Sequence, residues 1–204
     1  MNRIDYKEYL SSLGHIIKNN YFFIIGIMIF LMIMLVIEIM LADMSSTGMD
    51  INPAVTIIMF FINMLIQLGI VKIAVNMTNR KPYDFAMLFN PGGILFSFIA
   101  GTILYNLSVF IGLLMLIIPG IFIAVRLIFY PYLIVERGYT AIEALKASWG
   151  MTKKYQWQIF VISIILYAVN FIMAITVIGL AVSLPLTLIA LAQLYHHIKL
   201  RGWE

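Results

Sequence analysis

The sequence contains no cysteine and few charged residues. The absence of cysteine excludes a disulfide framework, thiolate metal sites and a cysteine nucleophile. Charged residues make up 11% of the 204 residues and apolar residues 63%, whereas a soluble domain carries about 25% charged and roughly 45–50% apolar residues. A chain of this length cannot bury so much apolar surface in a water-soluble fold. The composition therefore predicts an integral membrane protein.

Recognisable catalytic and phosphate-binding motifs are also absent. The sequence has no Gly-x-Ser-x-Gly, His-Glu-x-x-His or P-loop pattern, and Gly92-Gly93 after Pro91 is typical of a turn. His196 and His197 are adjacent, so on a helix they face different directions and cannot bind a metal as an i, i+4 pair. We therefore expect no enzyme and no cofactor or metal. Nucleic-acid binding is not expected either, because anionic lipid accounts for the dispersed basic residues.

Six apolar stretches are each long enough to cross a bilayer, which takes about twenty residues. They run over approximately 21–42, 53–78, 93–117, 119–136, 156–178 and 180–200. The third and fourth are nearly continuous, but proline disfavours helix at the residue before it, so we expect a tight turn at Pro119 and Gly120. Gly179 predicts a similar break before the sixth span, with Pro185 just inside that span. The expected fold is an all-α polytopic bundle of three hairpins in one domain, 1–204.

Basic residues indicate the orientation of the spans. The loop at 43–52 contains Asp43 and Asp50 but no lysine or arginine, and neither hairpin turn is charged. Every lysine and arginine outside the spans falls on the opposite side: Arg3, Lys7, Lys18, Arg80, Lys81, Arg137, Lys146, Lys153, Lys154, Lys199 and Arg201. The positive-inside rule then places both termini in the cytoplasm.

Three segments outside the spans are amphipathic. In residues 1–20, five apolar side chains share one helical face: Tyr6, Tyr9, Leu10, Leu13 and Ile17. This helix is expected either on the membrane surface or packed on the rest of the protein. A short helix from Pro82 is expected to align three apolar side chains: Phe85, Leu88 and Phe89.

The third amphipathic segment begins with a capping box formed by Thr140 and Glu143. Its apolar face consists of Ile142, Leu145 and Trp149. We expect this helix and the one from Pro82 to lie in the membrane interface, where aromatic and basic side chains anchor proteins. The expected anchors are Trp149, Lys153, Lys154 and Trp157.

Charged residues inside spans are the first candidates for function, because each costs about 2.5–3.5 kcal/mol on insertion scales. Lys72 is expected to reach the interface with its long side chain. Arg126 and Glu38 have opposite charge, and counting residues along each span places both in the outer half. They are expected either to pair inside the bundle or to reach the outer interface separately.

Neutral polar residues occur at similar depth in the spans. They are Asn63, Asn106 and Asn170, with Gln67 and Gln193 near mid-depth. Together with Arg126 they either form a polar layer that holds a lipid headgroup or a small solute, or make ordinary interhelical hydrogen bonds worth about 0.6 kcal/mol each.

A resemblance to known proteins rests on residues 116–160. An Ile-Pro-Gly turn and Arg126 are followed by Tyr-Pro-Tyr-Leu-Ile-Val-Glu, then by Glu-Ala-Leu-Lys-x-Ser-Trp and a basic-aromatic run. With the earlier Arg80-Lys81-Pro82-Tyr83-Asp84-Phe85 and Leu88-Phe89, this order resembles a poorly characterised group of bacterial six-helix membrane proteins. The group includes the YciC-like proteins and the membrane domain fused to some glycerophosphodiester phosphodiesterases.

The resemblance covers residues 80–200 and is most specific over 117–149. It implies a six-helix fold in a bacterial inner membrane. It matches Pro119 and Gly120 to the group's hairpin, and Ser148 and Trp149 to the interfacial helix. It supplies no catalytic residue, because the chemistry of the fused enzymes belongs to a separate soluble domain.

Three functions remain open from the sequence. A non-enzymatic protein that supports membrane or envelope homeostasis by binding lipid or membrane partners fits the missing catalytic groups and the interfacial helices. A small-solute transporter or channel fits Arg126, Glu38 and the asparagines, although no inverted repeat and little polar lining are present. The third is immunity against a membrane-active peptide. We favour the first, in the bacterial cytoplasmic membrane, with lipids as partners and other membrane proteins or a second copy of the chain as further candidates.

Overall fold

The computed structural model describes residues 5–46 and 53–200, and all regular structure in these ranges is helical. The helices are α1 (Tyr6–Asn19), α2 (Tyr21–Ser46), α3 (Pro53–Thr78), η1 (Phe85–Leu88), η2 (Gly92–Ile94), α4 (Leu95–Met115), α5 (Ile117–Leu127), α6 (Tyr130–Arg137), α7 (Ala141–Thr152), α8 (Gln156–Met173) and α9 (Val177–Leu200). Six segments are long and apolar enough to cross a membrane, which confirms the predicted all-α fold with six spans. Arg3, Asp50 and Arg201 lie outside the described residues.

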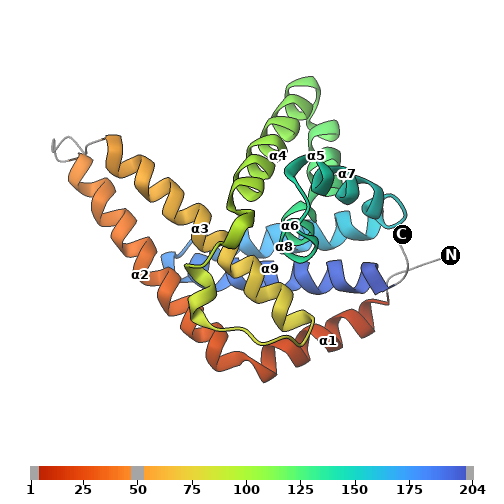
Figure 1. Ribbon diagram of the computed structural model, residues 1–204, viewed down its shortest axis with the longest axis horizontal. Helices are drawn as coiled ribbons and strands as arrows, with labels where there is room; N and C mark the ends of the chain where they lie inside the picture. Colours follow the sequence, from red (N-terminus) through yellow and green to blue (C-terminus); the bar gives the residue numbers. More distant parts are fainter. Residues whose placement is uncertain (1–4, 47–52, 201–204) are drawn as a thin grey trace.

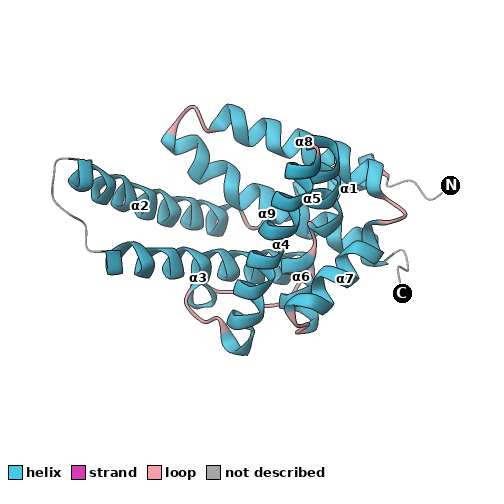
Figure 2. Ribbon diagram, turned by 90° about the horizontal axis from the view of Figure 1, so that it is seen from above, coloured by secondary structure: helices cyan, strands magenta, loops and turns pink. Residues whose placement is uncertain are grey.

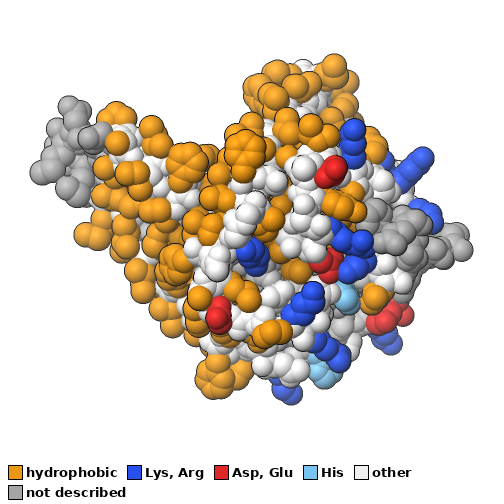
Figure 3. All heavy atoms as spheres, viewed as in Figure 1, with side chains coloured by type: hydrophobic (Ala, Val, Ile, Leu, Met, Phe, Trp, Pro, Cys, Tyr) orange, Lys and Arg blue, Asp and Glu red, His pale blue; other side chains and the backbone are white. Residues whose placement is uncertain are grey.

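Helix α9 lies at the centre of the molecule and packs against α1, α2, α3 and α8 (Figure 1). The most deeply buried side chains come from α3, α6 and α9, where the rings of Tyr132 and Tyr195 stack with centroids 5.8 Å apart. The α2–α3 pair and the α4–α5 hairpin point in different directions (Figures 1 and 2). Hydrophobic side chains cover both of these arms, whereas lysines and arginines gather near the start of α1 and the end of α9 (Figure 3).

Helix α1 packs against α9, which is one of the two placements that the sequence left open. Tyr9 is buried, its hydroxyl donates to the carbonyl of Ala190 (3.0 Å), and burial raises its pKa to about 12. Gln193 of α9 donates to the hydroxyl of Ser12 (2.9 Å). Tyr6 and Leu10 stay exposed beside this contact, so only part of the apolar stripe is used for packing.

The turn of the α4–α5 hairpin comes earlier than predicted. Leu116 is extended (φ −169°, ψ 152°), and α5 begins at Ile117, so Pro119 lies in the first turn of the helix. The prediction was wrong in position because an N–H in the first turn has no partner within the helix, and a proline is therefore tolerated there. Gly120 instead allows close packing: a Cβ on Gly112 would lie 2.9 Å from the Cα of Gly120.

The turn between α8 and α9 also precedes the predicted glycine. Helix α8 ends at Met173 and α9 begins at Val177. Gly179 lies in the first turn of α9, where a Cβ would collide with the carbonyl oxygen of Met173. Pro185 lies inside α9, as expected.

The fourth predicted span is broken in the middle, which the sequence analysis missed. Pro131 has no N–H to offer to the preceding turn, and α5 gives way to α6 across Ile128 and Phe129. Buried hydroxyls of α7 satisfy the freed backbone groups. Ser148 accepts from the N–H of Phe129 (3.1 Å), while Ser148 and Thr152 both donate to the carbonyl of residue 126 (3.0 and 3.1 Å).

Helix α7 begins with the predicted capping box, whose hydrogen bonds from Thr140 lower the pKa of Glu143. The helix packs on α4, α5 and α6 through its small side chains, among them Ala144 and Ser148. Of the predicted apolar face, Ile142 is exposed, whereas the ring of Trp149 packs edge-on against Phe122 of α5. An exposed apolar side chain here is compatible with a position at the membrane interface.

The segment after α3 folds back onto the bundle. Instead of a helix from Pro82, the chain forms the short 3₁₀ helix η1, and Leu88 is buried against α3. Gly69 of α3 permits this contact, because a Cβ there would collide with the backbone of Leu88. Lys72 was expected to extend toward the interface, and its Nζ reaches the loop after α3, where it donates to the carbonyls of Asn90 and Pro91 (2.8 Å each) and so holds the segment in place.

Candidate functional site

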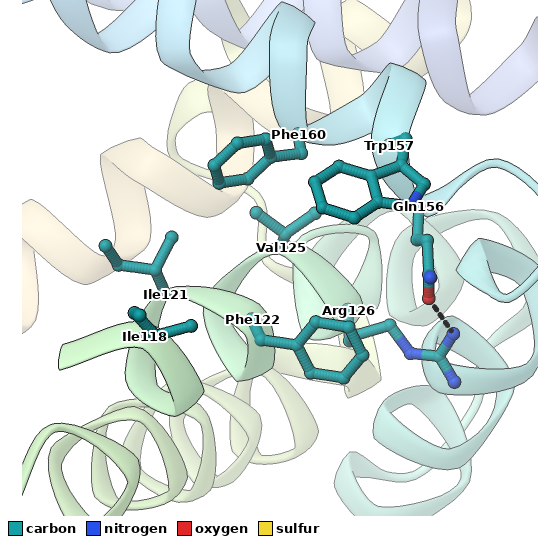
Figure 4. Close-up of a pocket in the computed structure, with 8 residues that line it drawn as sticks. All are labelled: Ile118, Ile121, Phe122, Val125, Arg126, Gln156, Trp157 and Phe160. Atoms are coloured by element: carbon teal, nitrogen blue, oxygen red, sulfur yellow. Dashed lines mark hydrogen bonds between the residues drawn. The ribbon is translucent and has the colours of Figure 1, made fainter. Parts of the chain in front are cut away.

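Arg126 is 4% exposed and lies in the last turn of α5. Its Nη1 donates to Oε1 of Gln156 over 3.4 Å (Figure 4). Because Gln156 is the first residue of α8, Arg126 lies near the end of the bundle that carries Lys153 and Lys154. Its predicted position in the outer half of a span is therefore wrong. The error arose because the count assumed one straight helix through the break between α5 and α6.

The guanidinium of Arg126 is packed against aromatic rings but has no acidic partner among residues 5–46 and 53–200. Its Cζ lies 4.4 Å from the ring centroid of Trp149 and 5.6 Å from that of Phe122, and its Nε has no hydrogen-bond partner. Each cation–π contact contributes about 0.5–2 kcal/mol. Aromatic rings do not cancel the charge, and burying an uncompensated ion costs several kcal/mol. The site is therefore electrostatically suited to an anion.

Arg126 stands at one end of an apolar groove between α5 and α8. A cavity of about 160 Å³ surrounds Arg126, Gln156 and Trp157, and another of about 620 Å³ extends between the α4–α5 hairpin and α8 as far as Phe171. The two cavities share three lining residues: Ile121, Val125 and Phe160. The two cavities therefore adjoin one another along α5 and α8, and together we name them the α5–α8 groove.

The predicted interfacial anchors lie beside the end of the groove that contains Arg126. Trp149 contacts the guanidinium, and Trp157 lines the groove while remaining 72% exposed. Lys153 and Lys154 are exposed in the turn that joins α7 to α8. Figure 4 shows Trp157 and Gln156 entering the site from α8, opposite Phe122 and Arg126 of α5. Aromatic and basic groups thus surround the polar end of an apolar groove.

Glu38 and Arg126 do not form the pair that the sequence suggested. Glu38 accepts a hydrogen bond from the side-chain amide of Asn63 on α3. Helices α2 and α5 belong to the two arms that point apart (Figure 1), and Arg126 bonds to Gln156 instead. The pairing alternative failed because similar depth in two spans does not make the helices neighbours.

The remaining polar candidates do not surround Arg126 either. Asn106 donates to a carbonyl of its own helix (2.9 Å), and Asn170 donates to Thr187 on α9 (2.6 Å). Gln193 bonds to α1, and Gln67 lines a separate cavity between α2, α3 and α9. Asn63, Asn170 and Gln193 therefore make separate interhelical hydrogen bonds, and the polar candidates do not gather into a layer around Arg126.

A half-buried charged network at the ends of α3, α6 and α9 was missed from the sequence. Oε1 of Glu136 accepts from Lys199 and from Asn79 (2.8 Å each), and its Oε2 accepts from the hydroxyl of Tyr195 (2.5 Å). The sequence did contain a signal for it: Glu136 and Lys199 lie at the ends of the fourth and sixth predicted spans, on the same side of the membrane. This network joins the spans where the basic side chains gather. Within the described ranges, no cluster of three His, Asp or Glu residues is placed to hold a metal ion.

Comparison with known families gives one match. The model of a domain of unknown function, DUF7847, matches residues 83–197, which is more than half of the chain. The matched range contains Arg126, α7 and every residue that lines the α5–α8 groove, and it lies within the region of the resemblance described above. The match assigns an uncharacterised family and no named one. No curated protein and no solved structure matches the chain.

Proposed function

The chain belongs to the DUF7847 family, and we propose that it is a non-enzymatic multi-pass membrane protein that binds an anionic lipid in the α5–α8 groove. The headgroup lies at Arg126, and one hydrocarbon chain follows the groove toward Phe171. The observation that carries this proposal is the buried guanidinium of Arg126, which has no acidic partner among the described residues and lies at the polar end of an apolar groove.

The headgroup assignment follows from the chemistry of arginine. A guanidinium forms paired, charge-assisted hydrogen bonds with phosphate or carboxylate. In Arg126 the long bond to Gln156 uses Nη1 and the buried Nε has no partner, so the hydrogen-bonding capacity of the guanidinium is only partly used within the protein. Hydrogen bonds to charged groups contribute about 1.5–3 kcal/mol each, and the anion would also remove the cost of an uncompensated buried cation.

The hydrocarbon assignment follows from the groove's lining. Beyond Arg126 and Gln156 the walls consist mainly of Ile, Val, Leu and Phe side chains. Such walls favour an apolar chain over a hydrated solute. Lys153 and Lys154 beside the polar end would attract the anionic leaflet from which the lipid comes.

We place the protein in a bacterial cytoplasmic membrane with both termini in the cytoplasm, where lipid binding would support envelope homeostasis. The distribution of lysine and arginine supports this orientation. The resemblance to YciC-like proteins supports the bacterial setting. Transport is less well supported, because the polar candidates have partners in separate places and the cavity at Arg126 is mostly apolar.

Native mass spectrometry of the purified full chain tests the proposal. The comparison is between the wild type, Arg126→Gln and Lys154→Gln, each titrated with phosphatidylglycerol and with phosphatidylcholine. Lys154 is the matched control, because it is an exposed cation next to the groove that does not line it. We expect one tightly retained phosphatidylglycerol on the wild type and on Lys154→Gln, and about 10-fold or greater weakening in Arg126→Gln, which is the loss of at least one charge-assisted hydrogen bond.

Two outcomes would contradict the proposal. One is equal binding of phosphatidylglycerol to the wild type and to Arg126→Gln. The other is equal binding of the anionic and zwitterionic lipids to the wild type. Thermal unfolding of each variant in the same detergent confirms that lost binding is not lost folding.

A further inference from the structure

A second unpaired polar group lines the α5–α8 groove. Ser163 of α8 is 2% exposed, and its Oγ makes no hydrogen bond within the described residues. Hydroxyls in membrane-spanning helices usually bond to a carbonyl of the preceding turn, as Thr102 and Ser108 do here (2.9 and 2.7 Å). Ser163 is different, and a buried hydroxyl without a partner is unfavourable unless something else satisfies it.

The two unpaired groups lie at different depths along the same groove. Ser163 follows Gln156, the hydrogen-bond partner of Arg126, by seven residues on α8. At about 1.5 Å per helical residue, Ser163 lies about 10 Å beyond Gln156 along α8, and we take this rise as the separation along the groove. Apolar side chains, among them Phe160, line the groove between them. The groove therefore combines a cation at its end with a neutral hydrogen-bonding group part-way along it.

We infer that the ligand of this groove is an anionic amphiphile whose chain itself carries a hydroxyl or amide group, placed to bond with Ser163. The inference rests on the proposed function and narrows the ligand class. An extended chain advances about 3.3–3.6 Å for every three bonds, so a separation of about 10 Å corresponds to roughly eight bonds. The ester groups of an ordinary glycerophospholipid lie closer to the phosphate than this. A lipid whose chain carries a hydroxyl or amide group near mid-chain fits both groups.

Calorimetric titration of the full chain in detergent with defined carboxylates tests the inference. The probes are hexadecanoate, its derivative hydroxylated next to the carboxylate, and its derivative hydroxylated at mid-chain. We expect the mid-chain derivative to bind the wild type about 3- to 10-fold more tightly than hexadecanoate, which is the effect of one neutral hydrogen bond. Ser163→Ala removes this preference and leaves the affinity for hexadecanoate unchanged.

Ser108→Ala is the matched control, since that hydroxyl bonds to its own helix and does not line the groove; it keeps the preference. Equal binding of all three carboxylates to the wild type, or a preference that persists in Ser163→Ala, would overturn the inference while leaving the proposed function intact. Hexadecanoate that binds Arg126→Gln as well as the wild type would overturn the proposed function itself.

Discussion

Replacing Arg126 with methionine should make the lipid-free protein more stable and the lipid-bound protein less so. Methionine preserves much of the length and packing of the side chain but removes the charge. In the wild type the guanidinium is buried beside Trp149 and Phe122 and has no acidic partner among the described residues. A residue kept for structure alone would show a loss of stability in both states.

The expected magnitude follows from two opposing terms. Burial of an uncompensated ion costs several kcal/mol, and two cation–π contacts recover about 0.5–2 kcal/mol each. The difference leaves Arg126→Met more stable than the lipid-free wild type by about 1–3 kcal/mol. For a chain of this length each kcal/mol corresponds to roughly 2–4 °C in Tm.

Adding an anionic lipid should reverse this order. At a free lipid concentration about 1,000 times its Kd, binding stabilises the wild type by about 4.1 kcal/mol, which exceeds the expected advantage of Arg126→Met. Arg126→Met lacks the charged partner and should gain far less. The measurement is thermal unfolding of delipidated protein in neutral detergent, with and without phosphatidylglycerol, and with Lys154→Met as the control for removal of an exposed cation.

The reasoning is refuted if Arg126→Met is less stable than the wild type without lipid and responds to phosphatidylglycerol as the wild type does. That result would mean that the aromatic contacts fully compensate the guanidinium and that it acts as a structural group. Lys154→Met should stay within about 0.5 kcal/mol of the wild type, as exposed substitutions generally do, and should keep the lipid response.

Two further predictions concern the scaffold around the groove. Glu136→Gln should lower the free energy of unfolding by about 1–3 kcal/mol, because it leaves Lys199 without its charged partner and weakens the hydrogen bonds from Asn79 and Tyr195. Thermal unfolding in detergent measures this loss, and an unchanged Tm would contradict it. Gly120→Ala should destabilise the α4–α5 hairpin by at least 1 kcal/mol, since its Cβ would lie 2.7 Å from the backbone nitrogen of Leu113. Gly150→Ala is the control, because Gly150 lies in a helix and no atom is within 4 Å of the new Cβ; it should be neutral or stabilising by up to about 1 kcal/mol. A Gly150→Ala variant less stable than Gly120→Ala would show that the hairpin is not closely packed at Gly120.

The number of spans was predictable because lipid leaves the backbone few alternatives. Backbone polar groups in the hydrocarbon must bond within the segment, so each apolar run of sufficient length becomes a helix. The second span, predicted at 53–78, is observed as Pro53–Thr78. The positions of two hairpin turns were predicted a few residues too late. A proline or glycine can lie either in the connection between two helices or in the first turn of the second helix, and the sequence does not distinguish these cases, as Pro119 and Gly179 show.

The surroundings of Arg126 could not be derived from residue spacing. Depth estimates assume straight and parallel helices, whereas the helix ends just after Arg126 and the arms that carry Arg126 and Glu38 diverge. Pro131 was the local signal for a break that the sequence analysis overlooked. The hydroxyls that bond to the unpaired backbone groups at the break come from α7, and this tertiary contact has no local signature in the sequence.

The break between α5 and α6 also explains why Arg126 stays buried. A long cationic side chain in a span ordinarily extends toward water, and rotation of its helix assists it. Here two hydroxyls of α7 bond to the backbone carbonyl of Arg126, and Ser148 also binds the N–H of Phe129, so the end of α5 is fixed against α7. Trp149, on the same helix as Ser148, then covers the guanidinium. The hydrogen bonds that α7 makes to the backbone at the break therefore also hold an uncompensated cation at the end of the groove. This coupling supports the proposal that an anionic ligand neutralises the charge of Arg126.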